Sequence, residues 1–163
     1  MTDIETPETQ TDREFAVVRW FHAPPSAVFR AWTEPTQMEW YLNPEQPRPE
    51  QPIEVDLRVG GAWRVPMVID AETDYITGGI YLEIVPDAKL VFAWGAVDGW
   101  PKLDPDDLEA GPIATLDLVE RDGGTEAMLT VQLPSSLSAP EVRHWLSLGI
   151  RPGWTQTFER LHL

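Results

Sequence analysis

The sequence has 163 residues, no cysteine, and 12 basic against 27 acidic residues, which give a formal net charge of −15. This charge disfavours nucleic acids and anionic membranes as partners, because such contacts require clustered Lys and Arg. The absence of cysteine excludes disulfides, thiolate catalysis and cysteine-ligated metal centres. A hydrophobic content of 42%, with 8 tryptophans, is enough for one sizeable core.

No apolar run approaches the ~20 residues of a membrane-spanning helix. The first residues also lack the basic and apolar regions of a signal peptide. We therefore expect a cytoplasmic protein that neither binds nucleic acid nor inserts into membranes, and that carries no cofactor.

Residues 1–12 are polar, acidic and rich in threonine, which is typical of a disordered tail. The remainder, residues 13–163, is expected to form a single domain. It opens with a strand over residues 13–22, in which Phe15, Val17 and Phe21 share one face.

Two short helices are predicted next, over residues 24–33 and 35–41. Pro24 and Pro25 favour a helix start, because proline fixes φ and the first helical position needs no N–H donor. The chain before Pro35 avoids the α region, so the first helix ends there. Four prolines within residues 43–52 then predict an extended loop, since such a segment fits neither helix nor central strand.

Alternating apolar residues separated by turn residues predict six further strands. Their expected ranges are 53–57, 62–69, 75–85, 90–94, 113–121 and 125–133. Gly78 and Gly79 predict a bulge or bend within the third of these strands. Between residues 95 and 112 lies a long acidic loop, and loops of this length are uncommon unless they are functional or disordered.

The C-terminal part is predicted to be helical. Ser138 and Glu141 have the spacing of a capping box, Gly149 is a plausible stop, and Pro152 restarts or kinks the helix. One main helix is expected, with a buried stripe formed by Ile150, Trp154, Phe158 and Leu161. The fold class is α+β: a curved antiparallel sheet of about six to seven strands around a long C-terminal helix.

Bulky aromatic residues occur in every predicted element, and they either fill a core or line a small hydrophobic ligand site. We expect a cavity between the sheet and the C-terminal helix, beneath the 95–112 loop, with Trp100 as a lid residue. The residues predicted to line it are Trp40, Trp63, Met67, Tyr81, Trp94, Trp154 and Phe158.

Evidence for catalysis is sparse, since no nucleophile elbow, phosphate-binding loop or zinc-binding helix motif is present. The histidines, His22, His144 and His162, do not share the spacing of a metal site, so none is predicted. Glu83 alternates with Tyr81 and either faces the concave side of the sheet, where a buried carboxylate requires a partner, or lies in water.

Several motifs resemble the SRPBCC (START-like, Bet v 1-like) superfamily, and most closely its branch homologous to the C-terminal domain of the activator of the Hsp90 ATPase. The opening stretch, residues 19–40, and the segment DLRVGGAW at residues 56–63 are similar to this branch. The same holds for the pattern over residues 79–92 and for the closing helix with Gly153-Trp154, Phe158, Arg160 and Leu161. The resemblance implies a helix-grip fold with a cavity between sheet and helix.

Three functions are compatible with this reading. The leading hypothesis is binding of a small hydrophobic or aromatic molecule in the cavity. A cyclase- or hydratase-like enzyme would use the same pocket, with Glu83, Tyr81 and Arg58 as the candidate acid–base groups. A protein-interaction module, similar to a co-chaperone, would dock a partner through residues 43–52 or 95–112. The oligomeric state stays open.

Overall fold

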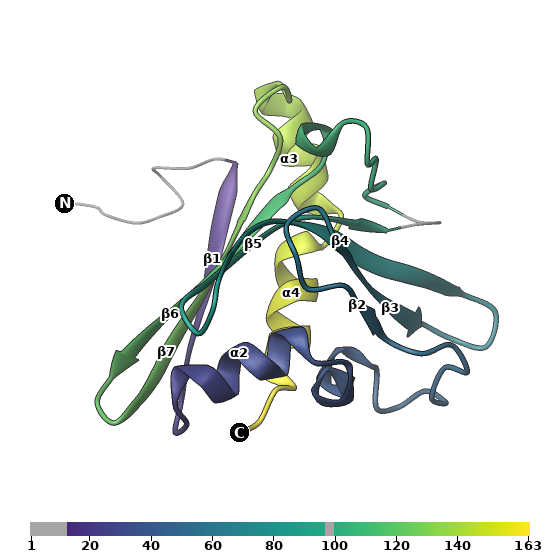
Figure 1. Cartoon of the computed structure of the whole chain (residues 1–163). Coiled ribbons are helices and arrows are strands. Elements are labelled where there is room, and N and C mark those ends of the chain that lie inside the picture. Colours follow the sequence, from purple (N-terminus) through teal and green to yellow (C-terminus); the bar gives the residue numbers. More distant parts are fainter. Residues whose placement is uncertain (1–12, 97–99) are drawn as a thin grey trace.

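A computed structural model of the chain describes residues 13–96 and 100–163, so the predicted tail over residues 1–12 lies outside the described residues. Figure 1 shows a strongly curved antiparallel sheet that surrounds a C-terminal helix. Its seven strands follow the order β1-β7-β6-β5-β4-β3-β2. They are β1 (Glu14–Phe21), β2 (Glu54–Val55), β3 (Ala62–Val68), β4 (Asp74–Val85), β5 (Lys89–Ala96), β6 (Ile113–Arg121) and β7 (Gly124–Gln132). The predicted α+β fold class is confirmed.

The concave face of the sheet forms one wall of the core. Leu90 pairs with Leu116, which in turn pairs with Leu129, so one row of buried leucines crosses three strands. Asp122 and Gly123 connect β6 to β7 with φ values of 53° and 77°. Positive φ at both central residues is the geometry of a tight hairpin turn that matches the strand twist.

The first helix is α2 (Pro25–Thr33), and two 3₁₀ turns follow it, η1 (Pro35–Gln37) and η2 (Glu39–Tyr41). Two short helical segments after β1 were expected, but the second is not continuous. Glu34 is extended, as a residue before proline must be, and Met38 interrupts the next turn with φ −98° and ψ 12°. This break turns Trp40 and Tyr41 into the core.

The C-terminal segment consists of two helices, α3 (Ala139–Ser147) and α4 (Ile150–Glu159). The capping box at Ser138 is present as predicted. The expectation of one main helix is wrong, because Gly149 adopts a left-handed conformation with φ 94°. Pro152 does not interrupt helix α4, since it lies in the first helical turn, where its missing N–H removes no helical hydrogen bond.

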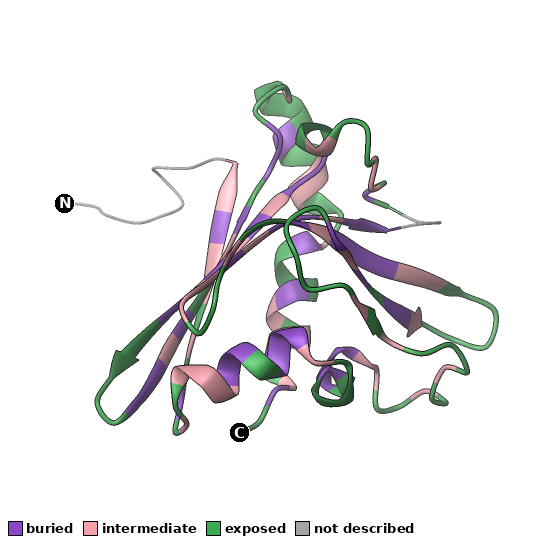
Figure 2. Cartoon of the chain, in the orientation of Figure 1, coloured by how far each residue is buried: buried purple, intermediate pink, exposed green. Residues whose placement is uncertain are grey.

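Helix α4 is held against the sheet by its apolar stripe and by the side chain of Arg19 on β1. Ile150, Trp154, Phe158 and Leu161 are all buried, as the sequence predicted. Arg19 Nη1 donates hydrogen bonds to the carbonyl oxygens of Phe158 and Leu161, both at 2.6 Å. These bonds place a charged donor at the C-terminal end of α4, where the Phe158 carbonyl also accepts from the Leu161 backbone N–H. Figure 2 shows the buried stripe facing the inner side of the sheet.

The centre of the core is a cluster of aromatic rings around Trp32. Its ring centroid lies 4.9 Å from that of Trp40, 5.3 Å from Phe158 and 6.3 Å from Trp154. Trp63 packs against Phe92 at 5.2 Å. These contacts join α2, η2, the sheet and α4 into one apolar cluster.

Gly79 admits the Trp63 ring, because a Cβ at this position would lie 2.4 Å from Trp63 Nε1. A bend was expected at Gly78-Gly79, but the register of β4 against β5 shifts further along, between Tyr81 and Glu83. Gly79 thus makes space for an indole, and the strand irregularity lies two residues further along.

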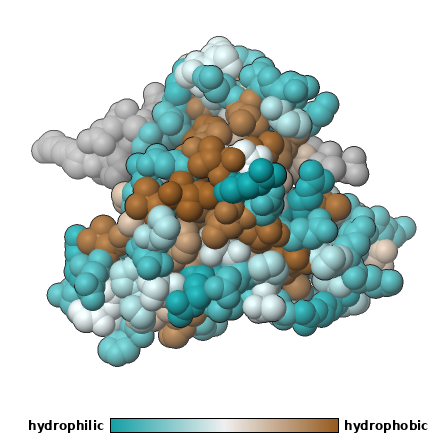
Figure 3. All heavy atoms as spheres, viewed as in Figure 1, coloured by the Kyte–Doolittle hydropathy of each residue, from teal (hydrophilic) through white to brown (hydrophobic). Residues whose placement is uncertain are grey.

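Figure 3 shows hydrophobic side chains gathered in the middle of the face seen in Figure 1. On the outer face of β1 and β7, Val18 and Met128 are paired and both are exposed. The outer side of the sheet is therefore partly apolar. No helix in the described ranges is long and apolar enough to cross a bilayer.

Candidate functional site

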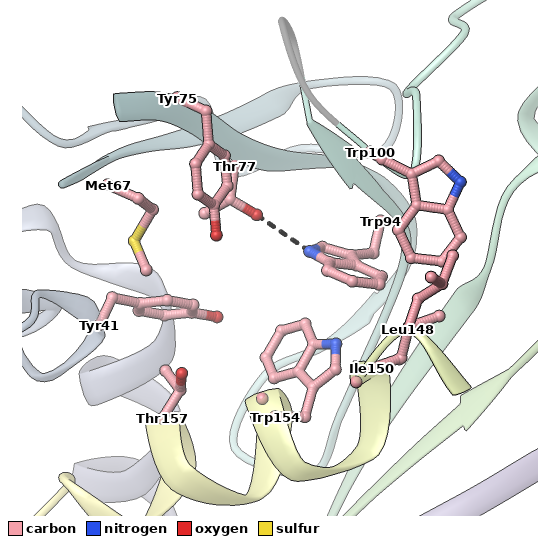
Figure 4. A pocket seen from close by; sticks show the side chains of 12 residues that line it. Tyr41, Met67, Tyr75, Thr77, Trp94, Trp100, Leu148, Ile150, Trp154 and Thr157 are labelled. Carbon is pink, nitrogen blue, oxygen red and sulfur yellow. Dashed lines mark hydrogen bonds between the residues drawn. The ribbon is translucent and has the colours of Figure 1, made fainter. Parts of the chain in front are cut away.

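A hollow of about 210 Å³ lies between one end of the sheet and helix α4. Strands β3, β4 and β5 contribute one wall, and α4 with the α3–α4 junction contributes the other, while Tyr41 closes the inner side (Figure 4). The lining residues are Tyr41, Met67, Tyr75, Thr77, Trp94, Trp100, Leu148, Gly149, Ile150, Gly153, Trp154 and Thr157.

Indole rings form one side of the hollow. Trp94 and Trp154 lie edge to face with centroids 5.3 Å apart. Trp94 Nε1 donates a hydrogen bond to Thr77 Oγ1 at 3.0 Å, which fixes its ring. Trp154 Nε1 is buried without an acceptor among the described residues, and the edge that carries it faces the Trp94 ring (Figure 4).

Hydroxyl groups form the opposite side. The phenol oxygens of Tyr41 and Tyr75 and the hydroxyl of Thr157 point into the hollow from three different elements (Figure 4). Burial raises the pKa of Tyr41 well above its ordinary value, with a further contribution from Tyr81. Burial also raises the pKa of Tyr75, which Arg160 partly opposes. Both phenols therefore keep their protons at neutral pH and can donate hydrogen bonds.

The rim combines the acidic loop with the end of α3. Trp100 packs edge to face on Trp145 with centroids 5.0 Å apart, and its own side chain is 44% exposed. Leu148 is 51% exposed and precedes the left-handed Gly149. Residues 97–99 of the predicted lid loop lie outside the described residues.

The structure divides the predicted lining residues into two groups. Met67, Trp94 and Trp154 border the hollow, and the predicted lid residue Trp100 lies at its rim. The other four lie in the filled core and do not line the hollow: Trp40, Trp63, Tyr81 and Phe158.

Sequence reasoning missed the hydroxyl side of the hollow. Tyr75 and Thr77 point to the same face of β4 because they are two residues apart, and Thr157 lies nearly one helical turn after Trp154. These spacings could have identified the three residues. Nothing comparable marks Tyr41, whose position depends on the break at Met38.

The candidate acid–base groups do not meet in the hollow. Glu83 is exposed and lies 3.8 Å from Lys89 Nζ, and Arg58 is exposed and pairs with Asp56 at 2.8 Å. The alternative in which Glu83 is buried is therefore wrong. The bulge between Tyr81 and Glu83 ends their alternation, so Tyr81 points inward and Glu83 outward.

Tyr81 is 1% exposed, and its hydroxyl has no hydrogen-bond partner among the described residues. Burial, with a smaller contribution from Asp56, raises the pKa of this phenol far above its ordinary value. It is therefore a neutral core residue at physiological pH.

The proline-rich segment passes the two 3₁₀ turns on its way to β2. Arg48 of this segment forms an ion pair with Glu39 of the second 3₁₀ turn. A second hollow of about 260 Å³ lies beneath the segment, between Pro35 and Pro66. Docking of a protein partner on this segment, or on the acidic loop, stays a prediction. Within residues 13–96 and 100–163, no three His, Cys, Asp or Glu side chains are grouped as metal ligands.

Solved structures share this architecture. Protein Ms6760 from Mycobacterium smegmatis is 20% identical, with a TM-score of 0.72 over 98% of this chain and 93% of that one. A Rhodobacter sphaeroides protein is 16% identical, with a TM-score of 0.71 over 92% and 90% of the two chains. An Arthrobacter aurescens protein is 22% identical, with a TM-score of 0.69 over 91% and 83%. These likenesses define the fold class: an α+β fold in which a curved antiparallel sheet surrounds a C-terminal helix.

The sequence model described as "Activator of Hsp90 ATPase homolog 1-like protein" matches residues 22–162. The chain therefore belongs to this family, as its motifs indicated. A comparison with curated proteins found no match.

Proposed function

We propose that the protein binds a small hydrophobic or aromatic molecule in the hollow between the sheet and α4. The observation that carries this proposal is the lining: three indoles and two phenols border about 210 Å³ of space. Sites for drug-sized ligands typically measure about 300–1,000 Å³. The hollow is smaller, so its ligand is a compact molecule.

Small residues on α4 support the proposal. Gly153 and Thr157 are spaced four apart and therefore lie on one face of α4, beside the stripe of large residues, and Gly149 precedes them at the N-cap. A Cβ on Gly153 would meet no atom within 4 Å. The space exists because this face carries almost no side-chain volume.

A binding role fits the chemistry of the lining better than acid–base catalysis does. Of the described residues that border the hollow, none carries a carboxylate or an imidazole. The two phenols hold their protons because burial raises the pKa of each. A phenol in this state is a poor general base at neutral pH.

Native mass spectrometry of the freshly purified protein, beside a denatured control, tests whether the chain carries a ligand. We expect a reproducible mass increment that disappears on denaturation. An apo mass, together with unchanged tryptophan fluorescence across a panel of aromatic and lipid compounds, would contradict the proposal.

A variant that fills the hollow provides the structural test. Gly153→Leu places a branched side chain where there is open space, and replacing glycine within a helix favours helix formation. We expect this variant to keep its fold and lose the ligand, while Gly153→Ala keeps both. Equal ligand occupancy in a folded Gly153→Leu variant would place the ligand elsewhere.

A further inference from the structure

The hollow has two chemically different sides, and this asymmetry restricts what can occupy it. Trp94, Trp100 and Trp154 present flat apolar rings on one side, whereas Tyr41, Tyr75 and Thr157 present hydroxyl groups on the other (Figure 4). A molecule that satisfies both sides needs a flat apolar body and a polar atom at one end.

The hydroxyl side offers donors that the protein itself does not use. Among the described residues, the hydroxyls of Tyr41, Tyr75 and Thr157 take part in none of the side-chain hydrogen bonds, in contrast to Thr77, which accepts from Trp94. The raised pKa values of the two tyrosines keep their protons in place. The polar end of the ligand is therefore best served by a hydrogen-bond acceptor such as a carbonyl oxygen.

The charge of the site disfavours an ionic ligand. No charged side chain occurs among the described lining residues, and the chain as a whole carries −15. The Arg160 guanidinium is close enough to influence Tyr75, but its Nη1 donates to the backbone carbonyl of Tyr41 at 3.0 Å and it does not line the hollow. A carboxylate would enter an apolar space without an opposite charge that contacts it.

We infer that the hollow takes an uncharged, flat molecule of one or two rings with a carbonyl-type acceptor at one end, oriented by Tyr41, Tyr75 and Thr157. This inference rests on the proposed function and assigns the class of its ligand. The indoles supply stacking area, and the three hydroxyls select the acceptor.

Three naphthalenes of nearly equal shape test the inference by calorimetric titration of the full chain. They are 2-acetylnaphthalene, 2-isopropenylnaphthalene, in which a CH₂ group replaces the carbonyl oxygen, and 2-naphthoate. We expect the ketone to bind about tenfold more tightly than the hydrocarbon, because it adds a hydrogen bond inside an apolar site. The carboxylate should bind at least about tenfold more weakly than the ketone.

Single variants identify the donors. Tyr75→Phe, Tyr41→Phe and Thr157→Val should each weaken ketone binding about three- to tenfold and leave hydrocarbon binding unchanged. Tyr81→Phe is the matched control, because it removes a buried phenol oxygen outside the hollow. This control should leave both affinities unchanged.

The possible failures are distinguishable. If the hydrocarbon or the carboxylate binds as tightly as the ketone, or if the hydroxyl variants have no effect, the ligand class is wrong although the hollow still binds ligands. If none of the three compounds binds, and Gly153→Leu changes nothing in native mass spectra, the proposed function itself is wrong.

Discussion

The two ends of the aromatic cluster use the same residue types with opposite results. Around Trp32 the rings of Trp40, Tyr41 and Phe158 fill the space between α2, η2 and α4. At the other end, Trp94 and Trp154 contact each other but leave a hollow between their rings and the hydroxyl groups of Tyr41 and Tyr75. The hollow therefore depends on the small residues of α4 and its N-cap, and not on how many aromatic residues surround it.

Removing a ring from the filled end should have the largest effect. Phe158→Ala deletes a fully buried ring that contacts Phe21, Trp32 and Trp40. We expect it to lower the free energy of unfolding by about 3–5 kcal/mol, as is typical for such cavities. Urea titration measures the change.

Trp100→Ala is the counterpart at the open end. Its ring is 44% exposed and packs on Trp145 alone among the described aromatic residues. The expected loss is about 1 kcal/mol. Equal losses for Phe158→Ala and Trp100→Ala would show that the two ends are not packed differently.

Removing the Arg19 hydrogen bonds to the C-terminal end of α4 should have the next largest effect. Arg19→Met keeps the alkyl chain but removes the two hydrogen bonds to the carbonyl groups of Phe158 and Leu161. A charged donor to buried acceptors contributes about 1.5–3 kcal/mol, so we expect a loss of this size. Arg58→Met, which removes an exposed ion pair, should cost less than about 1 kcal/mol.

Alkaline pH should lower the stability of the folded protein through the buried tyrosines Tyr41 and Tyr81. The folded protein holds the protons of Tyr41 and Tyr81 more tightly than the unfolded chain does, because burial raises both pKa values. Above the unfolded pKa of about 10, the folded state therefore binds more protons, and its stability falls as pH rises. Each tyrosine contributes up to about 1.4 kcal/mol per pH unit to this decline.

Thermal unfolding between pH 8 and 11.5 measures this decline, and Tyr81→Phe should make it shallower. At pH 7 the same variant should leave the free energy of unfolding nearly unchanged, since the removed hydroxyl has no partner among the described residues. An unchanged alkaline slope in Tyr81→Phe would contradict the assignment.

The smallest expected effects come from two glycine variants, which distinguish backbone strain from a direct effect on ligand binding. Gly149→Ala and Gly123→Ala each place a Cβ in open space on a backbone with positive φ, 94° and 77°. Each should lose about 1 kcal/mol. Only Gly149 borders the hollow, so only its variant should also change ligand affinity. A matching affinity change in Gly123→Ala would mean that binding follows global stability.

The fold could be predicted because its signals are periodic. Alternation gave the strands, and the stripe from Ile150 to Leu161 gave the buried face of α4. Both signals depend on the local geometry of helix and strand, which the sequence expresses directly. The break at Gly149 was visible as a helix stop, yet its consequence, two helices instead of one, depends on a left-handed residue in the folded chain.

The site could be predicted only in part, because it depends on what lies opposite each ring. Trp63 and Trp154 look alike in sequence. The first is enclosed by the space that Gly79 leaves, and the second borders open space over Gly153. The outward turn of Glu83 follows from a one-residue shift in strand register, which no local pattern announces.

The continuity of the tryptophan rings has an optical consequence. Trp40, Trp32, Trp154 and Trp94 follow one another at centroid separations of 4.9, 6.3 and 5.3 Å. Indoles this close exchange excitation energy and couple their transition dipoles. Light absorbed in the filled core can therefore be emitted beside the hollow. Trp94 and Trp154 border the hollow, so their near-ultraviolet circular dichroism should change when a ligand displaces either ring. The protein thus contains its own chromophore for detecting an occupant.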